Sequence, residues 1–197
     1  MYAWSLKNAK NSGLTEIDEK QELTNLRWCG NYTINKHWGY LSQFSCSEKQ
    51  LNAFLREDAL NDQANLYSIT RIVKYNEKVV GFFTLIADNI NIASLDKNQI
   101  EDIYADYHYA KLPAVKIARL ATDEHYERLG IGRIMLIQIF HLVDQISFIA
   151  GCRVITVDAK RDAVDFYKKF AFHEVSSKRD APYIPMYLDF KILRDGF

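Results

Sequence analysis

The sequence contains little cysteine, proline or glycine and has no net charge. Its 197 residues include three cysteines, three prolines and eight glycines, and 25 basic residues balance 25 acidic ones. Cys29, Cys46 and Cys152 form no Cys-x-x-Cys pair and no spacing typical of a metal site, so we expect reduced thiols, a cytoplasmic protein and no bound metal. Zero net charge argues against a strong positive electrostatic potential over the whole surface, which would attract nucleic acid or membranes. A local basic patch is still compatible with it.

Long apolar runs are also scarce. Residues 1–20 contain no apolar block of the kind that precedes a signal-peptide cleavage site. The longest apolar stretch, residues 131–150, carries Arg133, Gln138, His141 and Asp144, which indicates a core helix and not a membrane span. With 48% hydrophobic and 13% aromatic residues, the chain has the composition of a globular protein with a substantial core.

We expect two regions, with no internal repeat or evident linker. Residues 38–197 form one domain, and residues 1–37 form an extension packed on or beside it. The sparse apolar positions of residues 14–28 suit a peripheral helix. The extension is either an additional packing layer or an arm that binds a partner or forms a homodimer.

Helical and strand patterns alternate along the rest of the chain. Ser47 and Gln50 have the spacing of a capping box at the start of a helix. Gly81 lies inside a predicted hairpin strand and indicates a bulge or a close backbone approach, and Gly151 ends the long helix. The expected order is helix 47–60 with a short continuation over 58–64, strands 67–75 and 79–87, an insertion with a short helix over 90–109, strand 112–122, helix 131–150, strand 153–159, helix 160–170, and strands 172–175 and 183–190. This order predicts an α/β fold in which helices flank a central mixed sheet.

Strand 112–122 leads through a loop with Gly130 and Gly132 into the long helix. Glycine lets the backbone approach a ligand, and the first N–H groups of a helix have no internal acceptor, so the arrangement suits a phosphate. A dinucleotide fingerprint requires a third glycine where Met135 stands, and a P-loop requires Lys and Ser or Thr where Arg133 and Ile134 stand. Both of these interpretations fail, which leaves another kind of phosphate site or an ordinary tight turn.

The loop resembles the acyl-CoA loop of the GNAT N-acetyltransferase superfamily, whose pattern is Gln/Arg-x-x-Gly-x-Gly/Ala between a strand and a long helix. Gly130 and Gly132 match, whereas Glu127 occupies the Gln/Arg position. Residues 163–172 resemble the Ala-x-x-Phe-Tyr-x-x-x-Gly-Phe segment that ends the GNAT domain, with Ala171 in place of the glycine. The resemblance covers about residues 44–190 and implies the GNAT fold, acetyl-CoA as the acetyl donor and N-acetyltransferase activity.

The resemblance also implies a set of site residues. Tyr167 matches the family's general acid, and a tyrosine with a pKa near ~10 can protonate the departing CoA thiolate at neutral pH. The alternative is that Tyr167, like Phe166, only packs. His125 is a candidate general base, although a polar cluster before a turn is more often solvated. The residues implied to bind acetyl-CoA are Leu120, Ala121, Thr122, Arg128, Leu129, Gly130, Ile131, Gly132 and Arg133.

Three segments, residues 44–59, 79–85 and 112–121, resemble one branch of the family, the GNAT toxins of bacterial toxin–antitoxin pairs. This resemblance implies that the acceptor is the α-amino group of aminoacyl-tRNA and that an antitoxin is a partner. Residues 153–180 hold a slight excess of basic side chains that could contact tRNA. Two alternatives remain: a GNAT enzyme that acetylates a small amine or a peptide amine, and a non-catalytic module that binds CoA or a partner.

Overall fold

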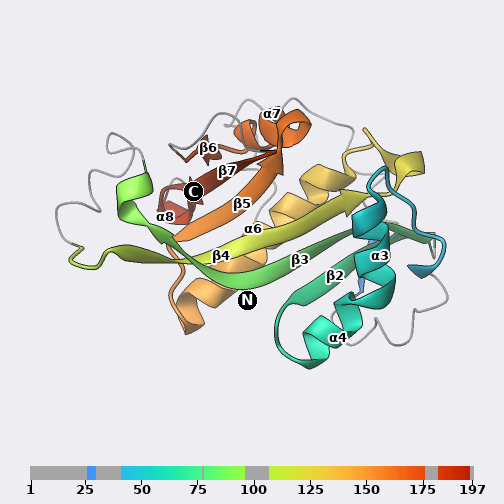
Figure 1. Ribbon diagram of the computed structural model, residues 1–197, viewed down its shortest axis with the longest axis horizontal. Coiled ribbons are helices and arrows are strands. Elements are labelled where there is room, and N and C mark those ends of the chain that lie inside the picture. Colours follow the sequence, from blue (N-terminus) through green and yellow to red (C-terminus); the bar gives the residue numbers. More distant parts are fainter. Residues whose placement is uncertain (1–25, 30–40, 77, 96–106, 176–181, 196–197) are drawn as a thin grey trace.

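The computed structural model describes residues 26–29, 41–76, 78–95, 107–175 and 182–195. They form a seven-stranded sheet in the order β1-β2-β3-β4-β5-β7-β6, with helices on both faces (Figure 1). The strands are β1 (Leu26–Cys29), β2 (Ile69–Tyr75), β3 (Lys78–Asn91), β4 (Lys111–Thr122), β5 (Val154–Lys160), β6 (His173–Glu174) and β7 (Tyr183–Asp189). The helices are α3 (Lys49–Glu57), α4 (Ala59–Ala64), α6 (Ile131–Ile149), α7 (Val164–Lys168) and α8 (Phe190–Asp195), with short 3-10 turns η4 (Ile92–Ser94), η6 (Glu124–Tyr126) and η7 (Arg161–Ala163).

The sheet is mixed, as predicted. β4 and β5 are parallel, because α6 carries the chain back along the sheet between them. The pairs β1–β2, β2–β3, β3–β4, β5–β7 and β6–β7 are antiparallel. The α/β fold class expected from the sequence is confirmed.

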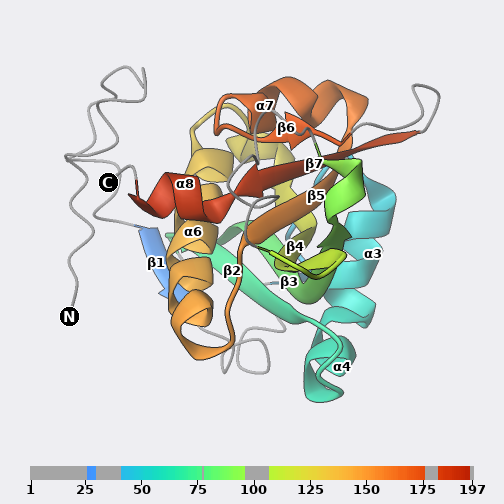
Figure 2. The ribbon, with the colours of Figure 1, turned by 90° about the vertical axis from the view of Figure 1, so that its left-hand side faces the viewer.

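The two faces of the sheet have separate cores. Figure 2 shows α6 on one face and α3 with α4 on the other. On the α6 face, Met135 and Ile139 pack with Phe83 of β3 and Ile155 of β5. α6 has the length and mean hydropathy of a helix that could cross a membrane, but one side of it forms this core, in agreement with the predicted core helix. On the other face, α3 and α4 pack on β2 and β3 around Phe82.

Several predicted elements differ from the observed ones. Residues 26–28, expected at the end of a helix, lie in β1, which pairs with β2; residues 14–25 fall outside the described chain. β3 continues to Asn91, into the segment predicted as an insertion, and the helix expected near Ile100 also lies outside the described residues. Helix 160–170 begins as the 3-10 turn η7, and α8 was not predicted.

The start of α3 also corrects the sequence interpretation. Its N-cap is Glu48, with no side-chain cap hydrogen bond, so the capping box of Ser47 and Gln50 does not form. Instead, the Asn52 amide bonds the backbone of Cys46 twice, accepting from its N–H at 2.9 Å and donating to its carbonyl at 2.9 Å. This exchange anchors the first turn of α3 to the preceding loop.

Gly81 has both features predicted for it. Val73 pairs with Gly81 and Lys74 with Val79, so β3 carries an extra residue, a bulge, at this point. A Cβ on Gly81 would lie 3.0 Å from a methyl carbon of Ile131 and 3.1 Å from the sulfur of Met135. The missing side chain therefore lets the first turns of α6 lie close to the sheet.

Candidate active site

β4 and β5 separate part of the way along the sheet. Their ladder pairs residues 114–117 with residues 154–157. β4 then continues to Thr122 and β5 to Lys160, without further pairing between them in the described chain. The edge of β4 that faces β5 thus has no ladder partner over residues 118–122. Because unpaired backbone groups need other partners, this edge can bond a ligand that enters the gap.

A bulge in β4 accounts for the separation. The register with β3 shifts by one residue between Ile117 and Arg119, so Ala118 is extra. A bulge bends its strand and increases the local twist, which turns β4 away from β5. It also resets the alternation of side chains, so Ile117 and Leu120 both contribute to the core on the α6 face.

The same shift places Arg119 on the opposite face, against α3. Its guanidinium carbon lies 3.4 Å from the centroid of the Phe54 ring, a cation–π contact. Burial lowers the pKa of Arg119, and the charges of Asp62 and Asp58 oppose that shift. An arginine starts from so high a pKa that it stays charged at neutral pH. The end of β4 is therefore apolar toward α6 and cationic toward α3.

The loop after β4 delivers the N-terminus of α6 to the same end of the sheet. Arg128 and Gly130 have positive φ angles of 63° and 82°, and Gly130 is the N-cap of α6. Ile134 donates the first helical hydrogen bond, to the Gly130 carbonyl at 3.1 Å. The N–H groups of Ile131 and Gly132 precede that bond and have no acceptor within the helix, so they form a positive helix end that suits an anion.

Gly132 has a packing role. A Cβ at this position would lie 3.2 Å and 3.3 Å from two ring carbons of Phe166. The ring of Phe166 in turn contacts that of Tyr167, with centroids 5.1 Å apart. The glycine therefore lets α7 approach the first turn of α6, and it brings Tyr167 near the positive helix end.

Tyr167 occupies the last turn of α7, which ends in a Schellman motif. The N–H of Phe172 donates to the Tyr167 carbonyl at 3.3 Å, and the N–H of Ala171 donates to the Lys168 carbonyl at 3.1 Å. Ala171 has a φ of 61°, the left-handed conformation for which glycine is usual at this position. The rings of Tyr167 and Phe172 meet edge to face, with centroids 5.4 Å apart. These bonds explain the spacing between the tyrosine and the final phenylalanine of the sequence motif.

The environment of Tyr167 is apolar. The residue is 5% exposed, and it belongs to the α6-face core against which Leu120 of β4 also packs. Burial raises the pKa of Tyr167 well above its usual value, because the phenolate is poorly solvated there. The hydroxyl is therefore fully protonated at neutral pH, as a proton donor must be.

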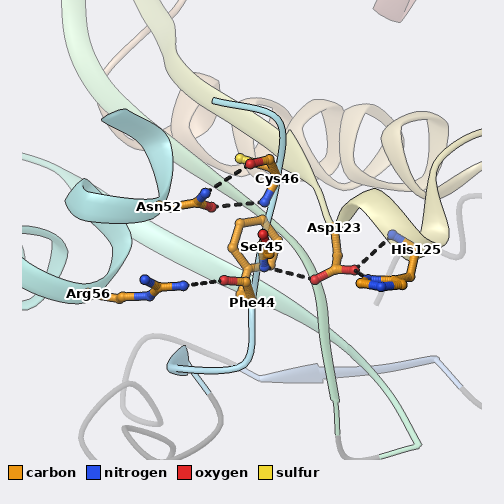
Figure 3. A network of polar contacts seen from close by, with 7 residues as sticks. All are labelled: Phe44, Ser45, Cys46, Asn52, Arg56, Asp123 and His125. Carbon is orange, nitrogen blue, oxygen red and sulfur yellow. Dashed lines mark hydrogen bonds and ion pairs between the residues drawn. The ribbon is translucent and has the colours of Figure 1, made fainter. Parts of the chain in front are cut away.

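Asp123, the residue after β4, joins the site to the loop before α3 (Figure 3). One carboxylate oxygen accepts from the Ser45 N–H at 2.9 Å, and the other from the His125 N–H at 3.0 Å. The Nδ1 atom of His125 lies 3.1 Å from the second oxygen. Asp123 is buried, whereas the His125 side chain is 76% exposed. Asp123 thus has a structural role that sequence analysis missed, although an Asp between a strand and a turn is a typical N-cap signal.

The structure brings most of the predicted acetyl-CoA residues to one end of the sheet. Residues 120–122 end β4 beside the gap, and residues 130–133 form the start of α6. Arg128 and Leu129 are exposed in the loop, and Arg133 is half-buried. These residues lie at the end of the sheet where β4 and β5 separate and where α6 begins. Their roles as ligands remain a prediction.

Comparison with known protein families identifies the family of this chain. Residues 36–172 match the model of the acetyltransferase (GNAT) family, and the chain belongs to this family. It is an acetyl-CoA-dependent N-acetyltransferase. A search of curated proteins found no match to the sequence.

Solved structures share the fold. A toxin described as AtaT complexed with acetyl-methionyl-tRNAfMet is 24% identical, with a TM-score of 0.69 over 78% of this chain and 89% of AtaT. A Tyr-to-Phe mutant of KacT is 19% identical, with a TM-score of 0.76 over 88% and 99% of the two chains. A crystal structure of a bacterial toxin is 18% identical, with a TM-score of 0.75 over 86% and 93%. The predicted likeness to GNAT toxins is confirmed at the level of the fold.

Proposed function

We propose that this N-acetyltransferase modifies the α-amino group of aminoacyl-tRNA and acts as a toxin. The observation that carries the proposal is the β4–β5 gap, which opens where β4 leads into the loop before α6 and where Leu120 packs on the core that contains Tyr167. This arrangement supplies an anion-binding helix end, an unpaired strand edge and a proton donor together. The fold neighbour AtaT was solved with acetyl-methionyl-tRNAfMet, the product expected of such a transfer.

In the proposed reaction, the amine nitrogen attacks the thioester carbonyl carbon. A C–N bond forms, the C–S bond breaks, and the sulfur leaves as a thiolate. Tyr167 gives its hydroxyl proton to the sulfur, and the proton lost by the nitrogen later restores the phenol. The raised pKa of Tyr167 keeps the phenol protonated before the transfer. It also makes the phenol a weaker acid, so the proton must move to the sulfur as the C–S bond breaks.

The donor is held chiefly by backbone groups in this proposal. N–H groups of residues 128–133 bind the pyrophosphate, and the backbone of Leu120, Ala121 and Thr122 bonds the pantetheine arm and the acetyl carbonyl. The side chains of Arg128 and Arg133 add charge near the phosphates. Backbone binding explains why Glu127, at the Gln/Arg position of the family pattern, is compatible with donor binding.

We also propose a cytoplasmic location and an antitoxin as partner. The neighbour AtaT was solved with the C-terminus of the antitoxin AtaR, and a complex named AtaTR was solved with AcCoA. A homodimer and a separate extension over residues 1–37 remain further proposals. Size-exclusion chromatography with light scattering tests the oligomeric state directly.

The acceptor is tested by incubating the protein with labelled acetyl-CoA and, separately, charged tRNA, peptides and polyamines. We expect label on charged tRNA, with a rate that falls steeply as salt is added, because phosphate contacts release counterions. Replacing Lys168, Lys169, Lys178 and Arg179 with Ala should weaken tRNA acetylation and leave acetyl-CoA binding unchanged. Expression should arrest growth, and Tyr167→Phe should relieve the arrest.

Three outcomes separate the alternatives. Label on peptides or polyamines, with none on charged tRNA, would favour a small-amine or peptide acetyltransferase. CoA binding without transfer to any amine would favour a non-catalytic module. Harmless expression of an active enzyme would contradict the toxin role.

A further inference from the structure

A charged pair lies where β4 and β5 separate. The reaction proposed above does not use it. Ile117 and Val157 form the last pair of the parallel ladder. Directly beside it, the Lys116 ammonium lies 2.6 Å from a carboxylate oxygen of Asp158. Asp158 is the first residue of β5 beyond the ladder, so its carboxylate stands at the inner end of the gap.

This pair lies on the face opposite Tyr167. Ile155, Val157 and Ala159 of β5 belong to the core on the α6 face, which also contains Tyr167. Side chains alternate along a strand, so Thr156, Asp158 and Lys160 point to the other face. A donor thioester in the gap would therefore have the phenol on one side and the Asp158 carboxylate on the other.

The carboxylate can be reached from solvent. The side chain of Asp158 is 49% exposed and that of Lys116 is 27% exposed. An exposed ion pair is weak, typically ~0–1 kcal/mol, so an incoming cation can replace Lys116 as the partner of Asp158. The pair thus resembles a site that is occupied by a side chain until an ammonium group arrives.

We propose that Asp158 binds the ammonium group of the acceptor and takes its first proton. This inference rests on the proposed acetyl transfer and adds the general base that it lacks. An α-amino group has a pKa near ~8 and is mostly charged at neutral pH, so it must lose a proton before it can attack. Asp158 accepts this proton from the ammonium and passes it to water at its exposed edge, and the neutral amine attacks the thioester carbonyl. The second proton leaves the nitrogen after attack and restores the phenol of Tyr167.

The charged and titratable groups around Asp158 define the pH experiment. Lys116 faces it from β4. Asp88 of β3 accepts a 2.7 Å hydrogen bond from Thr156, which points to the same face of β5 as Asp158. On the same face, Lys160 pairs with Glu48, the N-cap of α3. The strand β7 places Pro185 opposite Asp158, with Tyr183 and Tyr187 two residues to either side, and His173 of β6 contacts the Tyr187 ring.

The test compares Asp158→Asn with two other variants. Asp158→Asn keeps the shape of the side chain and removes its charge, whereas Lys116→Met removes the partner and leaves the carboxylate. Asp195→Asn in α8 is the control, because it also removes an exposed carboxylate that pairs with lysine. For each variant, kcat/KM for the acceptor is measured from pH 6.5 to pH 9, and acetyl-CoA affinity is measured by calorimetry.

We expect Asp158→Asn to lower kcat/KM about a hundredfold at pH 7, the usual range for a lost general base. The deficit should shrink to about tenfold at pH 9, because the neutral fraction of an amine with a pKa of ~8 rises from about a tenth at pH 7 to about nine-tenths at pH 9. Lys116→Met should raise kcat/KM for the acceptor, because the acceptor ammonium no longer competes with Lys116 for Asp158. Asp195→Asn should leave kcat/KM unchanged, and acetyl-CoA affinity should stay the same in all three variants.

Two different results would overturn the inference. An Asp158→Asn enzyme with parental kcat/KM at pH 7, or with an equal loss at every pH, would refute a role in deprotonation while the proposed acetyl transfer stands. A parent protein that acetylates no amine would refute the proposed function itself, and the role of Asp158 with it.

Discussion

Ala171 holds a backbone conformation that suits glycine, and Ala171→Gly should therefore stabilise the protein. Its φ is 61°, and it stands at the C′ position of the Schellman motif after α7, where the family pattern has glycine. The Ala171 side chain is exposed, so its methyl group contributes little to the core. The substitution removes the steric conflict of the left-handed conformation without removing a hydrogen bond.

The magnitude follows from two opposing effects. An L-residue in the left-handed helical region costs roughly 1–2 kcal/mol, which glycine avoids. Glycine gives the unfolded chain more freedom, which costs roughly 0.5–1 kcal/mol. The net stabilisation is about 0.5–1 kcal/mol. In a protein of this size, each kcal/mol shifts Tm by about 2–4 °C, so we expect Tm to rise by about 1–4 °C.

The chain offers matched controls at two other helix ends. Gly151 follows α6 with a φ of 68°, and an added Cβ would meet no atom within 4 Å, so Gly151→Ala should lower Tm by a similar amount. Leu66 follows α4 with a φ of 60° and is 85% exposed, and Leu66→Gly should raise Tm. Differential scanning calorimetry and urea unfolding measure all three. A lower Tm for Ala171→Gly, alongside the expected loss in Gly151→Ala, would refute the reasoning.

The other predictions concern the site and its supports. Gly81→Ala should destabilise the protein by about 1–3 kcal/mol, because the new methyl group would overlap α6, and it should weaken acetyl-CoA binding; a variant as stable and as tight-binding as the parent would contradict the close approach. Gly130→Asp should abolish acetyl-CoA binding in calorimetry. The added Cβ meets no atom within 4 Å but must adopt a φ of +82°, so we expect a loss of roughly 1–2 kcal/mol in stability and a protein that still folds; unchanged affinity would mean that the loop has another role. Tyr167→Phe should lower turnover about a hundredfold with acetyl-CoA affinity nearly intact, whereas a rate equal to that of the parent would assign Tyr167 to packing. Because burial raises the pKa of Tyr167, the parent should show no loss of rate from phenol ionisation as the pH approaches 10. Burial is also the largest cause that raises the pKa of the Cys46 thiol, so mass spectrometry should find it alkylated much more slowly in the folded protein than in urea at neutral pH; equal rates would contradict its burial.

The features that were predicted correctly from the sequence are those determined by residues close together in the chain. The hairpin, the long helix, its end at Gly151 and the loop with two glycines all follow from turn residues and periodicity within a few positions of each other. The same reasoning failed at Ser47, where the spacing of a capping box is present. There the Asn52 side chain bonds the Cys46 backbone and Glu48 becomes the N-cap. Residue spacing alone does not predict which of these local hydrogen bonds forms.

Other features depend on partners far away in the chain. Leu26–Cys29 is a strand because it completes the edge beside β2, and nothing in its own composition requires that. The role of Gly132 depends on Phe166, which lies in a different helix. In the sequence, Asp158 is an ordinary polar residue of a strand. Its place at the inner end of the gap follows only from the register of β4 against β5.

The bulge at Ala118 links these features into one arrangement. If residues 117–120 all paired in regular register with β3, strict alternation would place Leu120 on the face opposite Ile117, away from the core that holds Tyr167. Arg119 would then point toward that core and would have to be buried in it, at the cost of desolvating a charge. With the extra residue, Leu120 packs on the Tyr167 side and Arg119 lies over Phe54, while the added bend opens the gap. The bulge thus keeps Leu120 on the face that holds Tyr167 and Arg119 on the opposite face, which also carries Asp158. Deleting Ala118 would leave both residues on these faces, because their pairing with β3 would become regular, but it would remove the bend that turns β4 away from β5.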